Sequence, residues 1–112
     1  MIEGSNYETR VERLLGAPLA TDAIRRWPQS GEVLRGRERI AETESRFPNL
    51  KLGVTRRHTC DDIIVVEWDA DYGDGRMHRN VTIAELHESA VVRVTDYWDE
   101  PFIAPDLAKW TS

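Results

Sequence analysis

The chain has 112 residues, of which 40% are hydrophobic and 31% are charged, as is typical of an ordinary soluble globular protein. Its net charge of −5 disfavours a nucleic acid partner, and no apolar run reaches the roughly 20 residues that cross a bilayer. We expect a single domain over residues 1–112. Its expected location is the cytoplasm, because the N-terminus lacks a signal peptide pattern and the lone Cys60 cannot form an intrachain disulfide.

Three helical segments are predicted in the first half of the chain. Residues 5–8 fit a capping box, and apolar residues at helical spacing follow until Gly16 and Pro18. A second, short helix is predicted over residues 21–26, before a turn that contains Pro28 and Gly31. The third covers residues 37–46 and is stopped by Pro48.

From Leu50 the hydrophobic pattern changes to the period of two that is typical of strands. Strands are predicted over residues 50–60, 63–72, 77–86 and 91–98, with a hairpin signal at residues 73–75. In the second of these strands the even-numbered side chains are all apolar or aromatic, so this row should face the interior. Helices followed by an antiparallel run of strands indicate an α+β domain whose helices pack on one sheet face.

The opposite face of the predicted sheet is also partly apolar. Its row contains Ile63 and Val65 on one strand and Val81 and Ile83 on the next. A sheet face that contacts only water alternates more cleanly, so this patch predicts a protein interface, most simply that of a homodimer.

Arginines occur as two adjacent pairs, Arg25-Arg26 and Arg56-Arg57. The pairs are far apart and lack interleaved aromatic residues, so a solvated surface is a better interpretation than phosphate recognition. Arg37, at the start of its helix, is expected to pair with a carboxylate and to tie down the loop after Gly31.

Four stretches resemble the nuclear transport factor 2-like superfamily, specifically its SnoaL-like branch. They are Trp-Pro-Gln-Ser-Gly-Glu at 27–32, Arg-Gly-Arg-Glu at 35–38, Val-Val-Glu-Trp at 65–68 and Asp-Tyr-Trp-Asp-Glu-Pro-Phe at 96–102. The resemblance implies a curved sheet wrapped as a cone around helices, a pocket at its open end and a dimer through the outer sheet face. Relatives include polyketide cyclases, ketosteroid isomerase, limonene epoxide hydrolase and members that only bind ligands, so the fold does not decide the reaction.

The chain departs from the family in two respects. The long helical pair at the start is compressed into about 26 residues, which implies a short lid over the pocket. Aligned with the epoxide hydrolase pattern, the chain has Trp68 and Ala70 in place of an arginine and an aspartate, and only Asp96 is kept. The residues that would hold the attacking water fall near Arg26 and Pro28, so that mechanism is disfavoured.

Asp96 lies in a strand row that should face the interior, together with Val92, Val94 and Trp98. In a cone it would project into the pocket, where a poorly hydrated carboxyl group can exchange protons near neutral pH and act as a catalytic base. The alternative is a structural acid that accepts bonds from an arginine, a tyrosine or a helix terminus.

His78, Asn80 and Thr82 share a row that faces the cavity in the family register. His78 is the candidate partner of Asp96 in proton transfer and Asn80 a candidate carbonyl donor, although a polar wall with waters explains them as well. Four aromatic residues are candidates to line the pocket and bind a ring system, and core packing is the competing explanation. These four are Trp27, Trp68, Tyr72 and Trp98.

Metal and thiol chemistry find little support in the sequence. His58, Cys60, Asp61 and Asp62 are metal-ligand types, but they crowd into one turn without a second group elsewhere, so neither a metal nor another cofactor is expected. Two functions remain open. One is a binding domain for a small apolar or cyclic ligand; the other is a cofactor-independent isomerase, cyclase or lyase that uses Asp96 on a carbonyl substrate.

Overall fold

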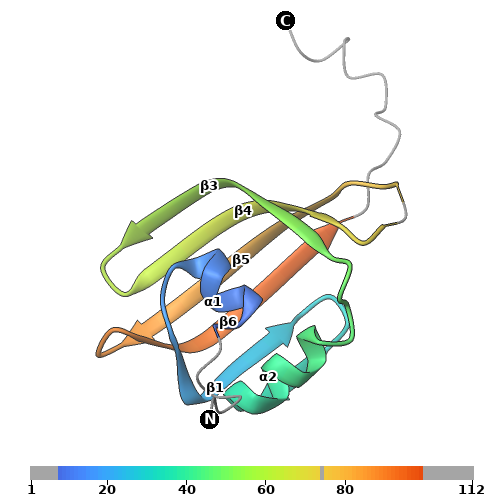
Figure 1. Ribbon diagram of the computed structural model, residues 1–112. Coiled ribbons are helices and arrows are strands. Elements are labelled where there is room, and N and C mark those ends of the chain that lie inside the picture. Colours follow the sequence, from blue (N-terminus) through green and yellow to red (C-terminus); the bar gives the residue numbers. More distant parts are fainter. Residues whose placement is uncertain (1–7, 74, 100–112) are drawn as a thin grey trace, which may run out of the picture.

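The computed structural model describes residues 8–73 and 75–99, which form two helices in front of a curved six-stranded sheet (Figure 1). In chain order the elements are α1 (Arg10–Leu15), β1 (Leu19–Trp27), β2 (Glu32–Arg35), α2 (Arg37–Glu44), β3 (Lys51–Cys60), β4 (Ile63–Asp71), β5 (His78–His87) and β6 (Ala90–Asp99). The predicted α+β class is therefore confirmed. The predicted helix over 37–46 and the four later strands are all present, with ends that differ by a few residues.

The order of strands in the sheet is β2-β1-β6-β5-β4-β3. The four predicted strands, β3 to β6, form the predicted antiparallel run, and β1 with β2 is also antiparallel; β1 and β6 pair in parallel, so the sheet is mixed. A parallel pair needs a long crossover connection, and here the rest of the chain provides it between the first and last strands.

The predicted helix over residues 21–26 was wrong, because these residues belong to β1. Its side chains alternate: Ala23 and Arg25 are buried, whereas Asp22 and Arg26 are exposed. Because one residue of the buried row is an arginine, the alternation of apolar and polar residues that is typical of a strand is absent from the sequence here. The same finding corrects the interpretation of Arg25-Arg26 as a solvated pair, since Arg25 is only 9% exposed.

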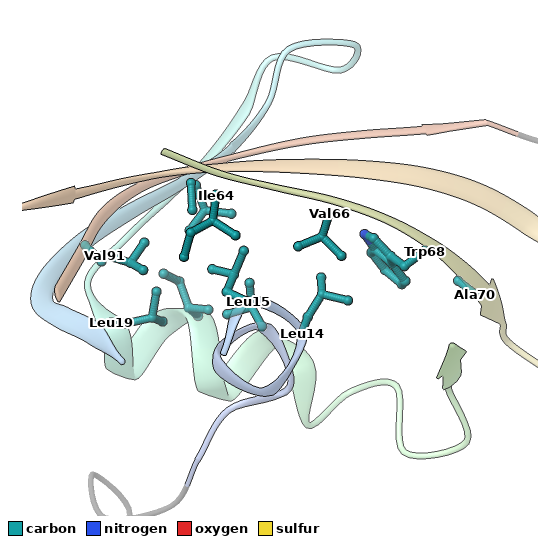
Figure 2. Packing of buried hydrophobic residues seen from close by; sticks show 13 residues of the cluster. Leu14, Leu15, Leu19, Ile64, Val66, Trp68, Ala70 and Val91 are labelled. Carbon is teal, nitrogen blue, oxygen red and sulfur yellow. The ribbon is translucent and has the colours of Figure 1, made fainter. Parts of the chain in front are cut away.

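The hydrophobic core lies between α1 and the concave face of the sheet (Figure 2). Leu14 and Leu15 of α1 are each 1% exposed and lie below Ile64 and Val66 of β4, whose exposed fractions are 4% and 0%. The prediction that the even row of this strand faces the helices is confirmed. Burial of such side chains contributes about 1.5–3 kcal/mol each, which lets a helix of six residues hold its place.

α1 begins with a capping box, but not the predicted one. Ser5, Asn6 and Tyr7 lie outside the described residues, and the box in the structure is formed by Thr9 and Glu12. The end of the helix at Gly16 was predicted correctly. Gly16 has φ 75° and its N–H donates to the carbonyl of Glu12, a left-handed cap in which glycine avoids a steric penalty.

Glu12 also ties α1 to the start of β1 and of α2. Its carboxylate accepts hydrogen bonds from the N–H groups of Thr9 and Leu19 and forms an ion pair with Arg37, whose Nη2 lies 2.8 Å from Oε1. Burial alone would raise the pKa of Glu12, but Arg37 and the two N–H groups outweigh it and lower the pKa to about 2. Arg37 thus has the expected carboxylate partner, supplied by α1.

β3 contains a bulge between Val54 and Arg56, where the register with β4 shifts by one residue. Consequently the even-numbered side chains of this strand do not form one row, because a one-residue shift moves the side chains after the bulge to the other face. Arg57 now points to the concave side, where its Nη2 donates to the carbonyl of Leu14 at 2.7 Å. A cation at the C-terminus of α1 is favoured by the helix dipole, so Arg57 is not simply solvated.

Neither of the two helices in the described part of the chain has the length and apolar character needed to cross a membrane.

Candidate functional site

Two adjoining cavities lie between the concave face of the sheet and α2. The inner cavity, of about 100 Å³, is lined by residues of both helices, of β1 and β2, and of β3 to β6. The outer cavity, of about 770 Å³, is lined by the β1–β2 hairpin, by Phe47 after α2 and by the ends of β4, β5 and β6. Trp27, Leu34, Thr43, Tyr72 and Trp98 line both, as does Phe47, so the two cavities are joined.

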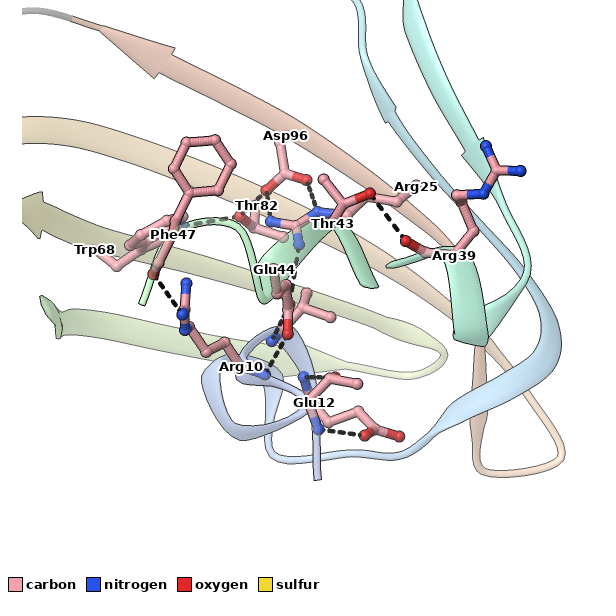
Figure 3. Close-up of polar contacts among 12 residues, drawn as sticks. Arg10, Glu12, Arg25, Arg39, Thr43, Glu44, Phe47, Trp68, Thr82 and Asp96 are labelled. Carbon is pink, nitrogen blue, oxygen red and sulfur yellow. Dashed lines mark hydrogen bonds and ion pairs between the residues drawn. The ribbon is translucent and has the colours of Figure 1, made fainter. Parts of the chain in front are cut away.

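The inner end of this site contains a buried ion pair between β1 and β6 (Figure 3). Arg25 Nε lies 2.5 Å from Asp96 Oδ2, and Arg25 Nη2 lies 3.3 Å from Asp96 Oδ1. Asp96 is 2% exposed. A two-point contact with a guanidinium is the strong form of a charge-assisted hydrogen bond. It compensates the Asp96 carboxylate for the hydration that it loses on burial.

Arg25 contacts a second carboxylate, that of Glu44 at the end of α2. Arg25 Nη1 lies 3.3 Å from Glu44 Oε2, and Glu44 also accepts hydrogen bonds from the N–H groups of Arg10 and Val11 at the start of α1. Burial would lower the pKa of Arg25, but Asp96 first and Glu44 second raise it above its usual value. The guanidinium is therefore a permanent cation that joins β1, β6 and α2.

A short hydrogen-bond chain continues from Asp96 across the sheet. The hydroxyl of Thr82 on β5 donates to Asp96 Oδ1 at 2.6 Å and accepts a hydrogen bond from Trp68 Nε1 on β4 at 2.8 Å. Thr82 is fully buried, and Trp68 is 6% exposed. The chain fixes the orientation of the indole ring and occupies the second oxygen of Asp96.

Four rings form a continuous edge-to-face series along one wall of the outer cavity. Phe47 packs against Tyr72, Tyr72 against His78, and His78 against Trp98, with centroid separations of 5.9, 5.3 and 5.3 Å. The interplanar angles of 73° to 77° are those that aromatic pairs prefer. All four residues line the outer cavity, and we call this series the aromatic wall.

Gln29 links the turn of the β1–β2 hairpin to the aromatic wall. Its side-chain amide donates to the carbonyl of Trp98 and accepts from the N–H of Trp98, both at 2.9 Å. The last residue of β1 that pairs with β6 is Arg26. Beyond it, the side-chain amide of Gln29 takes the place of a backbone partner for β6. This contact fixes the backbone of Trp98 to the hairpin turn.

Asn80 supplies a polar group to the inner cavity. The residue is 5% exposed, and its Oδ1 has no hydrogen-bond partner among the described residues. A buried acceptor without a donor costs about 1–3 kcal/mol, so this oxygen is a place where a bound molecule or a water gains a hydrogen bond.

The structure brings most of the predicted site residues to one place. The inner cavity is lined by Trp27, Trp68, Tyr72, Asn80, Asp96 and Trp98. His78 lines only the outer cavity, and Thr82 lies beneath the surface, as a support for Trp68 and Asp96. Asp96 has the arginine partner that the structural alternative required.

Sequence reasoning missed several residues of the site, among them Arg25, Glu44 and Phe47. Arg25 was expected in a short helix with a solvated arginine pair, and Glu44 and Phe47, at the end of the predicted helix over 37–46 and just after it, were given no role in the site. The available signal was the alternation of Ala23, Arg25 and Trp27, which an inward-facing arginine made unreadable.

Metal ligands are not clustered in the described part of the chain, where no group of three or more His, Cys, Asp or Glu residues is placed to hold an ion. Cys60, at the end of β3, is exposed and lies outside both cavities.

A curved mixed sheet around two short helices, with a cavity at its open end, defines a cone-shaped α+β protein. The chain belongs to the nuclear transport factor 2-like superfamily, as the sequence motifs imply. It is 31% identical to a solved member of unknown function from Burkholderia xenovorans, with a TM-score of 0.76 over 84% of this chain and 75% of that one.

Two further solved structures share the fold. A candidate ketosteroid isomerase from Kribbella flavida is 30% identical, with a TM-score of 0.71 over 78% of this chain and 64% of that one. A hypothetical protein from Catenulispora acidiphila with a ketosteroid isomerase-like fold, solved in complex with trimethylamine, is 18% identical, with a TM-score of 0.59 over 70% and 68%. No family model matches the sequence, and no curated protein matches it.

Proposed function

We propose that this protein binds a small, largely apolar, ring-containing molecule in the joined cavities and does not use Asp96 as a catalytic base. The observation that carries the proposal is the contrast between the two ends of the site. The outer end has accessible rings, with Phe47 48%, Tyr72 38% and Trp98 41% exposed. The inner end has a carboxylate that is already engaged by Arg25 and Thr82.

The contacts of Asp96 weigh against a role in proton transfer. A base must accept a proton from the substrate, and Asp96 would do so only by giving up hydrogen bonds to Arg25, which is itself buried and charged. An unpaired buried guanidinium is costly, so Asp96 has a structural role as the partner of Arg25. A base that works near neutral pH is usually placed without such a partner.

A second candidate function, acid/base catalysis of the cyclase or isomerase type, is favoured by one observation: Asp96 does line the inner cavity. The candidate ketosteroid isomerase from Kribbella flavida also shares the fold. The Asp96→Asn variant separates the two functions. Catalysis through Asp96 requires that turnover of a carbonyl substrate fall by roughly a hundredfold with binding retained. If the protein only binds its ligand, the Asp96→Asn variant should lose ligand affinity only to the extent that the substitution disturbs the fold.

The direct test is a titration of ¹⁵N-labelled protein with water-soluble mono- and bicyclic compounds, followed through the indole N–H signals. Three of the four tryptophans in the sequence line the inner cavity, namely Trp27, Trp68 and Trp98. We expect saturable shifts of these three signals. The proposal is wrong if no ring compound shifts them at millimolar concentration.

A pair of variants controls for surface binding. Trp98→Ala removes one ring of the aromatic wall and should weaken binding by about tenfold, because an aromatic contact contributes on the order of 1 kcal/mol beyond area burial. Val33→Ala is the matched control, since Val33 is 46% exposed and lies outside the lining of both cavities. Equal effects of the two changes would argue against the cavity as the binding place.

We also propose that two copies associate through the convex face of the sheet. Val65 and Ile83 are directly paired across β4 and β5, and Val81 is paired with Tyr97 on β6. Tyr97 is 40% exposed and Ile63 is 38% exposed, which leaves an apolar strip over three strands. An exposed strip of this kind is favourable to bury against an identical strip in a symmetric dimer.

A further inference from the structure

We infer that the molecule bound in the joined cavities is an organic cation: an amine attached to an apolar or aromatic group, with its protonated nitrogen beside the aromatic wall. This inference rests on the proposed function, which leaves the charge of the ligand open. Three independent features of the site support it, namely the balance of charge, the geometry of the rings and the buried acceptor.

Charge is unevenly distributed along the cavities. Among the described lining residues, the carboxylates of Glu32, Glu44, Asp96 and Asp99 outnumber the guanidinium groups of Arg10 and Arg25. Glu32 and Asp99 are both exposed and lie in the outer cavity, whose described lining contains no lysine or arginine. An anionic ligand would therefore be repelled at the mouth, whereas a cation would be attracted.

The two arginines of the inner cavity do not reverse this balance. Arg25 is engaged by two carboxylates at once, so its charge is already compensated. The guanidinium of Arg10 donates to the backbone carbonyl of Phe47, and its backbone N–H donates to Glu44. A ligand carboxylate would have to displace these contacts to bind either group.

The rings are arranged to receive a positive charge. Successive rings of the aromatic wall turn by roughly a right angle, and Phe47, Tyr72 and Trp98 are each more than a third exposed and line the outer cavity, so part of their ring surface is accessible there. Ring faces carry the negative part of the quadrupole and attract cations. Trp27 already binds one in this way, since the guanidinium carbon of Arg25 lies 5.0 Å from its ring centroid.

The buried acceptor, Asn80 Oδ1, favours a ligand that carries an N–H donor. Asn80 lines the inner cavity, and its buried Oδ1 has no partner among the described residues; a protonated amine that reaches this oxygen carries an N–H that can satisfy it. A neutral ring compound without a donor would leave this oxygen unsatisfied. A ligand with an N–H therefore has an advantage over a quaternary ammonium of similar shape.

The test uses four probes that share a benzene ring and differ in charge. These are N,N-dimethylbenzylamine, which is protonated at neutral pH and has one N–H; benzyltrimethylammonium, a cation without N–H; N,N-dimethylbenzamide, which is neutral; and phenylacetate, an anion. Dissociation constants are measured through the indole signals at low ionic strength. We expect both cations to bind at least about tenfold more tightly than the amide and phenylacetate. Of the two cations, dimethylbenzylamine should bind more tightly.

Variants assign the preference to the residues named. The double change Glu32→Gln with Asp99→Asn should weaken both cations by about fivefold to tenfold and leave the amide unchanged. Glu88→Gln, which removes an equally exposed charge on the β5–β6 turn, should have no effect on either. Asn80→Leu should remove the advantage of dimethylbenzylamine over the quaternary cation.

The outcomes separate this inference from the proposed function. If the amide or phenylacetate binds as tightly as the cations, or if only neutral ring compounds bind, the ligand is not a cation and the inference is overturned while the cavity remains a binding site. If neither these probes nor the ring panel shifts the signals of Trp27, Trp68 and Trp98, the proposed function fails, and the inference fails with it.

Discussion

Arg25 and Asp96 are 71 residues apart in the chain, yet they form a buried ion pair through two contacts of 2.5 and 3.3 Å between neighbouring strands. The pair joins the first strand of the chain to the last at the inner end of the cavity. Removing one partner of a buried pair leaves the other charge uncompensated. This lowers stability more than replacing both partners with apolar residues does.

The first prediction concerns this pair. Asp96→Asn should lower the free energy of unfolding by about 3 kcal/mol, because Arg25 stays buried with only Glu44 to oppose its charge. The double variant Arg25→Met with Asp96→Leu should recover much of the loss, since no buried charge remains. Urea unfolding measures both. Asp22→Asn, at an exposed position of β1, is the control, and a double variant less stable than the single one would contradict the prediction.

Thr82→Val tests the hydrogen-bond chain. The two side chains have almost the same shape, but valine leaves Trp68 Nε1 without its acceptor and removes the hydroxyl donor from Asp96 Oδ1, to which Arg25 Nη2 still donates. We expect a loss of about 1–3 kcal/mol and a shift of the Trp68 indole N–H signal. Thr59→Val, at an exposed position of β3, should change stability by less than about 0.5 kcal/mol. Unchanged stability of Thr82→Val would mean that the hydroxyl is not structural.

Glu12 makes the stability of the fold depend on pH in the acid range. Its pKa is about 2 in the folded protein, below the usual value of 4.5. A lowered pKa means that the stabilisation is complete above about pH 4.5 and is lost as the pH falls toward 2, by at most roughly 3 kcal/mol. Glu12→Gln should be less stable at pH 6 and lose less between pH 6 and 2. Denaturant curves at several pH values, with Glu88→Gln as control, measure this; parallel losses in all three proteins would contradict it.

The proposed dimer is tested by a charge placed in the apolar strip of the convex face. Ile83→Lys puts an ammonium group beside Val65, where it would be buried against an identical charge in a symmetric pair. Light scattering should give twice the chain mass of 12.9 kDa for the unmodified protein and a single chain mass for the variant. Val54→Lys, on β3 and 43% exposed, should remain dimeric. A monomeric unmodified protein at micromolar concentration would refute the proposal.

The sequence alone was sufficient for those elements whose side chains follow a regular hydrophobic pattern. β4 is recognisable because Ile64, Val66, Trp68 and Ala70 face the core in strict alternation, and α1 ends at Gly16 because a left-handed cap favours glycine. Some of the aromatic and polar positions on the later strands, such as Trp68, Asn80 and Trp98, were also predicted to share one face, because the row of a strand determines which side chains share a face.

Only the tertiary structure decided what these side chains contact. Whether Asp96 meets a proton donor, water or a fixed cation depends on the parallel pairing of β1 with β6, which places Arg25 beside Val94 in register and so near Asp96 on the same face. No local pattern encodes a pairing between segments separated by most of the chain, and an inward-facing arginine even imitates a surface residue. The charge state and partners of the site are long-range properties, because they are set by which strands become neighbours when the sheet closes around its core.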